Sequence, residues 1–76
     1  MTENNYKIII ANNIKKFRET KGLSQESFAA QVGFHRTYIG SIERCERNLT
    51  LSTLTTLANF MGITVQKLLT EENQHE

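Results

Sequence analysis

The fold is decided by residues 23–48, which read LSQESFAAQVGFHRTYIGSIERCERN. Two short helical patterns meet in this stretch. The first should cover residues 25–32, because the hydroxyl of Ser24 can accept hydrogen bonds from the free amides of a first helical turn. Gly33 then tolerates a left-handed backbone at the helix end. The second pattern turns Ile39 and Ile42 inward and should end near residue 44. These residues predict two short helices joined by a tight turn.

Apolar side chains at helical spacing predict three further helices, at residues 6–21, 51–61 and 65–69. The three consecutive isoleucines near the start can also be read as a strand, but no second strand pattern exists to pair with them. The sequence therefore predicts one all-α domain of five helices over residues 1–76, with a polar tail at residues 70–76.

Composition excludes several classes of protein. No apolar run approaches the roughly 18 residues of a membrane-spanning helix, and the N-terminus is polar rather than a signal peptide. One cysteine and two distant histidines provide neither a disulfide nor a metal-ligand set, so we expect no metal, no cofactor and a reducing, cytoplasmic location.

Positive charge is concentrated in the first two thirds of the chain. The net charge is only +1, but residues 1–48 hold eight Lys or Arg against five Glu. This excess of positive charge lies in the part of the chain that contains the two short helices, and it favours a nucleic-acid partner. The alternative is an ordinary solvated helix face for four of these side chains: Lys7, Lys15, Lys16 and Lys21.

The outer face of the second short helix is polar and has little bulk, as a helix that enters the major groove of DNA requires. We therefore interpret residues 24–45 as a helix-turn-helix that reads DNA. Arg36 is the best candidate for base contact, because a guanidinium can bond both O6 and N7 of guanine. Thr37 and Ser41 offer hydroxyls, with solvated surface as the alternative. Arg44, two turns on, can reach a base or a phosphate.

The whole pattern resembles the repressor and Cro type of helix-turn-helix, the xenobiotic-response-element family. The resemblance covers about residues 9–70 and implies the fold of that family. It is carried by the joint spacing of Ile14, Phe17, Arg18, Gly22, Leu23, Ser24, Gln25, Phe28, Ala29, Gly33, Tyr38, Ile39, Ile42, Glu43, Arg44, Leu54, Leu57, Ala58, Gly62, Ile63, Leu68 and Leu69.

The resemblance implies roles for individual residues. Gln25 resembles the family's phosphate clamp in the first turn of a helix, and Tyr38 resembles a residue that lies against the sugar-phosphate backbone. The alternative for Tyr38 is a ring half packed against the preceding helix. Arg18 and Glu43 match positions that form an ion pair between the first and third helices. Further contacts to the DNA backbone are expected from two residues of the following loop, Arg47 and Asn48.

Within this family the chain is similar to the controller proteins of restriction-modification systems, on residues 36–39, 42–44 and 47–50. Those proteins are small homodimers that bind paired operators, activating at low concentration and repressing at high concentration. The resemblance therefore implies a transcription regulator on a pseudo-palindromic, double-stranded DNA operator. RNA polymerase is a further candidate partner, through an outward-facing Glu26.

The dimer surface is expected after Met61, where the apolar residues exceed what a small monomer can bury. Four residues make up this candidate surface: Ile63, Val65, Leu68 and Leu69. The alternative is that they complete the core of the monomer.

Three residues of the helix-turn-helix are unusual. Gly40 costs up to about 1 kcal/mol inside a helix, but it would let the backbone approach the bases. The alternative is a neutral surface substitution. His35 stands where a short capping side chain is common, and we expect it to be neutral unless a phosphate lies beside it. Cys45 stands where Gly or Asn is frequent. Either the helix continues past it, or its backbone is strained by about 1 kcal/mol or more.

Two other classes of function are less consistent with the sequence. An antitoxin or phage-type repressor of the same fold would bind a protein partner as well as its own promoter. Antitoxins usually carry an extension for that partner, and only short tails are spare here. An enzyme would have to pair Cys45 with His35, which lie about 15 Å apart at 1.5 Å per helical residue. We therefore expect no catalytic residues.

Overall fold

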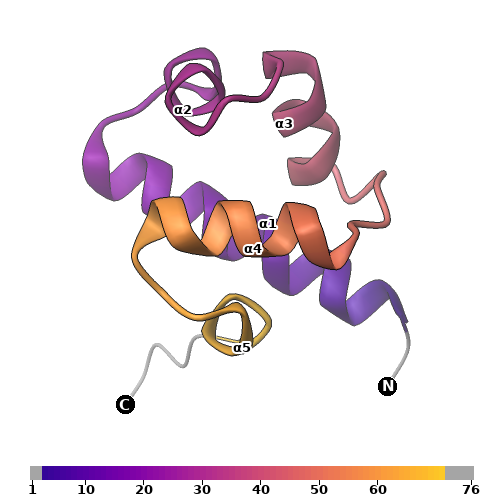
Figure 1. Ribbon diagram of the computed structural model, residues 1–76. Helices are drawn as coiled ribbons and strands as arrows, with labels where there is room; N and C mark the ends of the chain where they lie inside the picture. The colour runs from indigo at the N-terminus through magenta and orange to yellow at the C-terminus, as the bar shows by residue number, and fades with distance from the viewer. Residues whose placement is uncertain (1–2, 72–76) are drawn as a thin grey trace.

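Five helices follow one another in residues 3–71, the part of the chain that the computed structural model describes (Figure 1). They are α1 (Glu3–Lys21), α2 (Gln25–Val32), α3 (Arg36–Glu43), α4 (Leu51–Met61) and α5 (Val65–Leu68). This range contains no strand, so the all-α prediction is confirmed. None of the described helices is both long and apolar enough to cross a lipid bilayer.

The predicted boundaries are close to the observed ones. Helix α1 begins three residues before its predicted start and includes the three consecutive isoleucines. Helices α3 and α5 each end one residue earlier than predicted. Most of the predicted polar tail, residues 72–76, lies outside the described residues.

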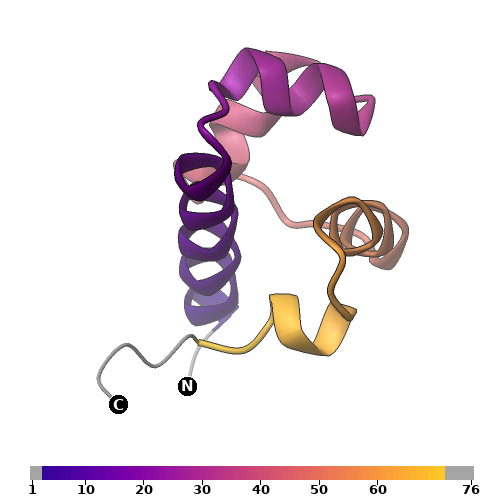
Figure 2. The ribbon, with the colours of Figure 1, turned by 90° about the vertical axis from the view of Figure 1, so that its left-hand side faces the viewer.

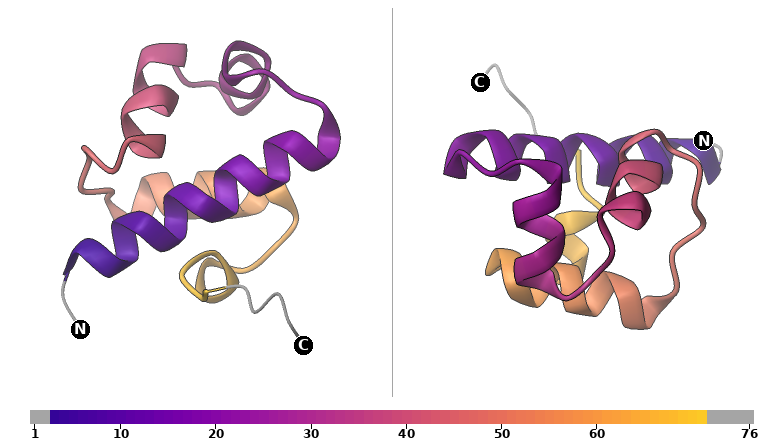
Figure 3. Two further views of the ribbon diagram at one scale, coloured as in Figure 1. Left: turned by 180° about the vertical axis from the view of Figure 1, so that it is seen from behind. Right: turned by 90° about the horizontal axis from the view of Figure 1, so that it is seen from above.

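Helices α2 and α3 lie together on one side of the molecule, and α5 lies on the opposite side (Figures 1 and 2). Between these two sides, α1 and α4 run along separate edges, as the view from above in Figure 3 shows. The two short helices therefore rest on a frame that the longer helices provide.

The hydrophobic core is shared by all five helices, because each contributes one large side chain that is fully buried. These side chains are Ile14, Phe28, Ile39, Leu57 and Leu68. The rings of Phe17, Phe28 and Phe60 meet edge to face, with centroids 5.5 to 6.0 Å apart. Such pairs contribute about 0.5–1.5 kcal/mol beyond the burial of their area.

The prediction that Leu68 lies on the dimer surface is wrong. Its side chain has no exposed surface and belongs to the core of the monomer. Its backbone oxygen also accepts a hydrogen bond from Asn13 Nδ2 at 2.8 Å, which ties α5 to α1. A dimer must therefore use other apolar side chains.

Side-chain caps fix where α2 and α3 begin. Ser24 Oγ accepts from the amide of Ser27 at 3.0 Å, and His35 Nδ1 accepts from the amide of Thr37 at 3.1 Å. Gly33 ends α2 with a φ of 100°, the left-handed conformation that the sequence predicts. These contacts set the length and direction of the turn between the two helices.

Candidate nucleic-acid interface

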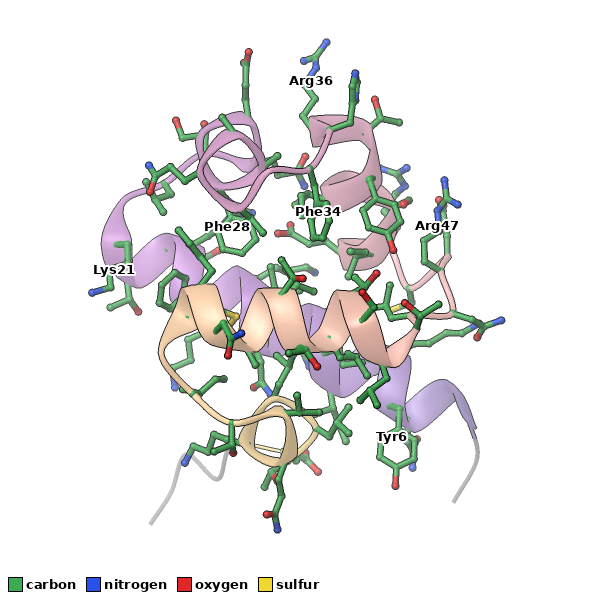
Figure 4. All side chains as sticks on the ribbon, viewed as in Figure 1. Tyr6, Lys21, Phe28, Phe34, Arg36 and Arg47 are labelled. Carbon is green, nitrogen blue, oxygen red and sulfur yellow. The ribbon has the colours of Figure 1, made fainter. Side chains whose placement is uncertain are left out.

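Arg36 projects from the first turn of α3, away from the rest of the molecule (Figure 4). Its side chain is exposed, and so is that of the neighbouring Thr37. Within residues 3–71, no hydrogen bond or ion pair engages the Arg36 guanidinium. All five N–H donors of this fork are therefore free to meet an external acceptor such as a base edge.

Three side chains from α1, α2 and α3 form a network that sets the position of α3. Arg18 Nε donates to Glu43 Oε2 at 2.7 Å, and Arg18 Nη2 donates to Glu43 Oε1 at 3.0 Å, so the predicted ion pair is present. Gln25 Nε2 donates to Glu43 Oε1 at 2.9 Å. Arg18 Nη1 also donates to the backbone oxygen of Leu23 at 2.9 Å. Hydrogen bonding to Glu43 raises the pKa of Arg18 despite the opposing effect of burial.

The same network changes how Gln25 can act as a phosphate clamp. One N–H of its amide is occupied by Glu43, but the amide nitrogen carries a second hydrogen and the side chain is exposed. Gln25 can therefore donate to a phosphate while its orientation is held by Glu43.

Ser41 does not face outward, and that part of the prediction is wrong. The residue is only 5 % exposed. Its hydroxyl donates to the backbone oxygen of Tyr38 at 2.7 Å and accepts from Arg47 Nε at 3.0 Å. Gly40, also expected outside, is buried as well. Ser41 thus orients Arg47 rather than offering a free hydroxyl to DNA.

Tyr38 and Arg47 lie against each other. The Arg47 guanidinium lies 5.2 Å from the centre of the Tyr38 ring, which itself meets the Phe34 ring edge to face at 5.3 Å. Arg47 is exposed and points outward (Figure 4), whereas Tyr38 is half-buried. The guanidinium is therefore held by its stacking and by Ser41 while its outer nitrogens face solvent. Asn48 is exposed too, but it borders an apolar groove described below.

Arg44 is paired with a residue that the sequence did not single out. Its Nε donates to Glu46 Oε2 at 3.1 Å, and its Nη2 donates to Glu46 Oε1 at 3.2 Å. These hydrogen bonds, followed by the charge of Glu46, raise the pKa of Arg44. A Cβ built on Gly40 would lie 3.1 Å from Arg44 Nη1, so the glycine leaves room for this guanidinium against α3.

His35 and Cys45 lie at opposite ends of α3, and each has a structural role. His35 caps the helix, and a nitrogen that accepts from Thr37 carries no proton, which leaves Nε2 as the N–H donor. Cys45 follows the helix with a φ of 64°, so the strained alternative considered from the sequence is the observed one. The amide of Glu46 then donates to the backbone oxygen of Ser41 at 2.9 Å, which closes the turn.

Large apolar side chains are exposed on both α1 and α4. Tyr6, Ile8 and Leu51 are the exposed large hydrophobic residues of the described chain. A groove of about 340 Å³ is lined by one of them, Tyr6, together with Lys7, Ile10, Arg47, Asn48, Leu49, Leu54 and Leu69.

The three remaining candidates for the dimer surface are half-buried and pack against the core: Ile63, Val65 and Leu69. Leu69 borders the groove just described. Ile63 instead borders a second groove of about 610 Å³, with Phe17 and Met61. Ile63 and Leu69 therefore line different grooves.

The geometry agrees with the comparison to protein families. The model of the helix-turn-helix family matches residues 14–68, from α1 to α5. The chain belongs to the helix-turn-helix family. Among the described residues of this helix-turn-helix protein, no group of three His, Cys, Asp or Glu side chains is placed to hold a metal ion.

Known helix-turn-helix proteins similar to this chain are regulators. It is 53% identical to the control protein C.SmaI of Serratia marcescens, over 87% of this chain and 79% of that protein. A hypothetical transcription factor from Neisseria matches with a TM-score of 0.83 and 36% identity, over 92% of this chain and 79% of that one. The restriction-modification controller C.Esp1396I was solved as a tetramer with its natural 35 base-pair operator. It matches with a TM-score of 0.66 and 30% identity, over 91% of this chain and 97% of that one. The chain is thus a DNA-binding regulator of the controller type and not an enzyme.

Proposed function

We propose that this protein is the controller of a restriction-modification system and binds a pseudo-palindromic operator as a homodimer. The observation that carries this proposal is the placement of Arg36. It is exposed and without a partner among the described residues, at one end of a helix whose other end is fixed by Glu43. A free guanidinium on a rigid helix suits the reading of a base edge.

Base reading is assigned to the exposed face of α3. With its N-terminal end in the major groove, Arg36 donates to O6 and N7 of a guanine, a contact that discriminates against other bases by about 1–3 kcal/mol. Thr37, next to it and exposed, offers its hydroxyl and methyl group. Arg44 reaches a second position once it leaves Glu46.

Contacts to the DNA backbone are assigned to residues on either side of α3. Gln25 lies in the first turn of α2, where the helix end favours an anion. Arg47 presents its outer nitrogens beside Tyr38. Such contacts fix the orientation of the protein without reading sequence. Asn48 is the weaker candidate, because it borders the apolar groove.

The homodimer is assigned to the groove lined by Tyr6, Leu54 and Leu69, together with Leu51, which lies one helical turn before Leu54 on α4. Leu51 is 70% exposed although it is apolar, and the groove with Leu69 continues the apolar surface. In Figure 4, Tyr6 and Arg47 mark the right-hand side of the molecule, and Arg47 is the nearer of the two to the end from which Arg36 projects. A partner docked here by a two-fold axis places its own Arg36 on the same edge, so that two copies of α3 can enter successive major grooves about 34 Å apart.

Activation of transcription also requires a contact with RNA polymerase. Glu26 is exposed in the first turn of α2, beside the proposed DNA edge, and its position supports it as that contact.

Selection from a library of randomised duplexes by the full chain tests the proposed function. We expect one pseudo-palindromic sequence to be enriched. Affinity for it should fall with salt, at a log-log slope of about −0.9 for each phosphate neutralised. Recovery of no preferred sequence, or an association that does not depend on salt, would overturn the proposal and indicate a protein partner instead.

A further inference from the structure

Glu46 lies beside Arg44 because of the shape of the turn after α3. Residues two apart do not face each other along a regular helix. Here the left-handed backbone of Cys45 reverses the chain, and the amide of Glu46 is held by the backbone oxygen of Ser41 at 2.9 Å. The Glu46 carboxylate thereby meets the Arg44 guanidinium in a two-point contact, at 3.1 and 3.2 Å.

The pair lies on the surface assigned to DNA. Arg44 Nη1 and Gln25 Oε1 both border the space that Gly40 leaves open, 3.1 and 3.4 Å from a Cβ built there. Arg44 therefore reaches across α3 toward the start of α2, where a phosphate contact is proposed. Glu46 is the acidic side chain that accompanies it.

The chemistry of this pair differs from that of Arg18 and Glu43. The Arg44 and Glu46 side chains are 59% and 54% exposed, against 15% and 3% for the buried pair. Exposed ion pairs contribute little to stability, so the fold does not depend on this contact. The Glu46 carboxylate offers Arg44 two acceptor oxygens side by side. Guanine offers an arginine two acceptors in a similar arrangement, N7 and O6.

We propose that Glu46 is a specificity-determining residue that competes with DNA for Arg44. This inference rests on the proposed function. While Arg44 is paired with Glu46, the two charges cancel. The pair therefore does not attract the phosphates of DNA that lacks the operator sequence. At the operator, a correctly placed guanine offers a two-point contact that replaces the carboxylate. Nonspecific binding is thereby weakened more than specific binding.

The variant Glu46→Gln tests this inference in the full chain. Binding to the selected operator and to a scrambled duplex of equal length is measured by fluorescence anisotropy at several salt concentrations. We expect the variant to bind the scrambled duplex several-fold more tightly, with a log-log salt slope steeper by about 0.9 for each protomer whose Arg44 is released. Affinity for the operator should rise less, so the ratio of the two affinities falls. An unchanged ratio would overturn the inference.

A double-mutant cycle with Arg44→Gln separates competition for Arg44 from simple repulsion of phosphates. If Glu46 acts by holding Arg44, Glu46→Gln has no further effect in the Arg44→Gln background. An undiminished effect there would contradict the inference, because Glu46 would then act on DNA directly. Glu71→Gln removes the same charge three residues after α5, the helix that lies on the side opposite α2 and α3, and should leave the ratio unchanged.

The outcomes also separate this inference from the proposed function. Failure of the unmodified protein to select any operator rejects the proposed function itself. If the unmodified protein selects an operator, but Glu46→Gln has the same ratio of operator affinity to scrambled-duplex affinity, only the role of Glu46 is rejected.

Discussion

Arg18 and Glu43 join α1 to the last turn of α3 through two hydrogen bonds of 2.7 and 3.0 Å, and Glu43 is almost fully buried. Glu43→Ala leaves the Arg18 charge partly buried without its partner. We expect a loss of about 3 kcal/mol in the free energy of unfolding, measured by urea denaturation. Glu46→Ala, which breaks the exposed pair, should cost less than about 1 kcal/mol. Equal losses in the two variants would contradict the assignment of Glu43 to a structural role.

The pH dependence of this contribution follows from the direction of the Arg18 shift. Hydrogen bonding to Glu43 raises the pKa of Arg18, so the folded protein holds this proton more tightly than the unfolded chain does. The stabilisation by the guanidinium is therefore complete at every pH below its ordinary pKa and is lost only at higher pH. We expect Arg18 to add no pH dependence to the free energy of unfolding between about pH 6 and pH 9.

Arg36→Ala should remove the preference for one operator base pair in each half-site. The loss of a two-point contact with guanine costs about 1–3 kcal/mol on the operator, whereas scrambled DNA should bind almost as before. Binding to a panel of single-substitution operators measures the change. Thr37→Ala serves as the comparison at a neighbouring exposed position. An unaltered preference at every base pair after Arg36→Ala would remove this residue from the reading surface.

Arg47→Ala should weaken operator and scrambled DNA alike, because a backbone contact carries no sequence information. The log-log salt slope should become shallower by about 0.9 for each protomer that loses a phosphate contact. Arg47→Lys keeps the charge but loses the Nε donor to Ser41 and the guanidinium that lies over the Tyr38 ring. It should restore the slope without restoring the full affinity. A loss confined to the operator sequence would assign Arg47 to base reading instead.

Much of the fold was predictable because its signals are local. Helical spacing marks the apolar face of each helix, and Gly33 marks the end of α2 where the left-handed backbone is found. The ion pair of Arg18 with Glu43 followed from the match to a family pattern. The burial of Leu68 in the monomer core was not predictable from spacing. A short apolar helix has the same sequence pattern whether it packs on its own core or against a second copy of the chain.

The errors in the candidate site come from the turn after α3. Helical periodicity predicts that Ser41 lies on the outer face of α3. It contains no information about whether the segment after α3 folds back and covers that face. The left-handed Cys45 produces that reversal and places Glu46 beside Arg44, and Arg47 then reaches Ser41. The usable signal was Cys45 at a position where glycine is frequent, which indicates a turn rather than a longer helix.

The strain at Cys45 gives a prediction of its own. A residue with a Cβ at a φ of 64° costs roughly 1–2 kcal/mol, which glycine avoids, although glycine also makes the unfolded chain more flexible. We therefore expect Cys45→Gly to raise the free energy of unfolding by about 0.5–1 kcal/mol. Cys45→Ala also removes the thiol but keeps the Cβ, so it should bring no such gain. Equal stabilisation by both variants would point to the thiol and not to the backbone.

The proposed dimer face can be tested at Leu51, which contributes little to the core because it is 70% exposed. Leu51→Lys should leave the thermal unfolding of the monomer nearly unchanged but place a charge in the apolar contact between two copies. Sedimentation at micromolar concentration should show a dimer for the unmodified protein and a monomer for the variant. Operator affinity should fall by at least about tenfold, since one half-site then has to be bound alone. Gln66→Lys adds the same charge at an exposed position of α5 and should remain dimeric. Persistence of the dimer in Leu51→Lys would show that two copies meet through another surface.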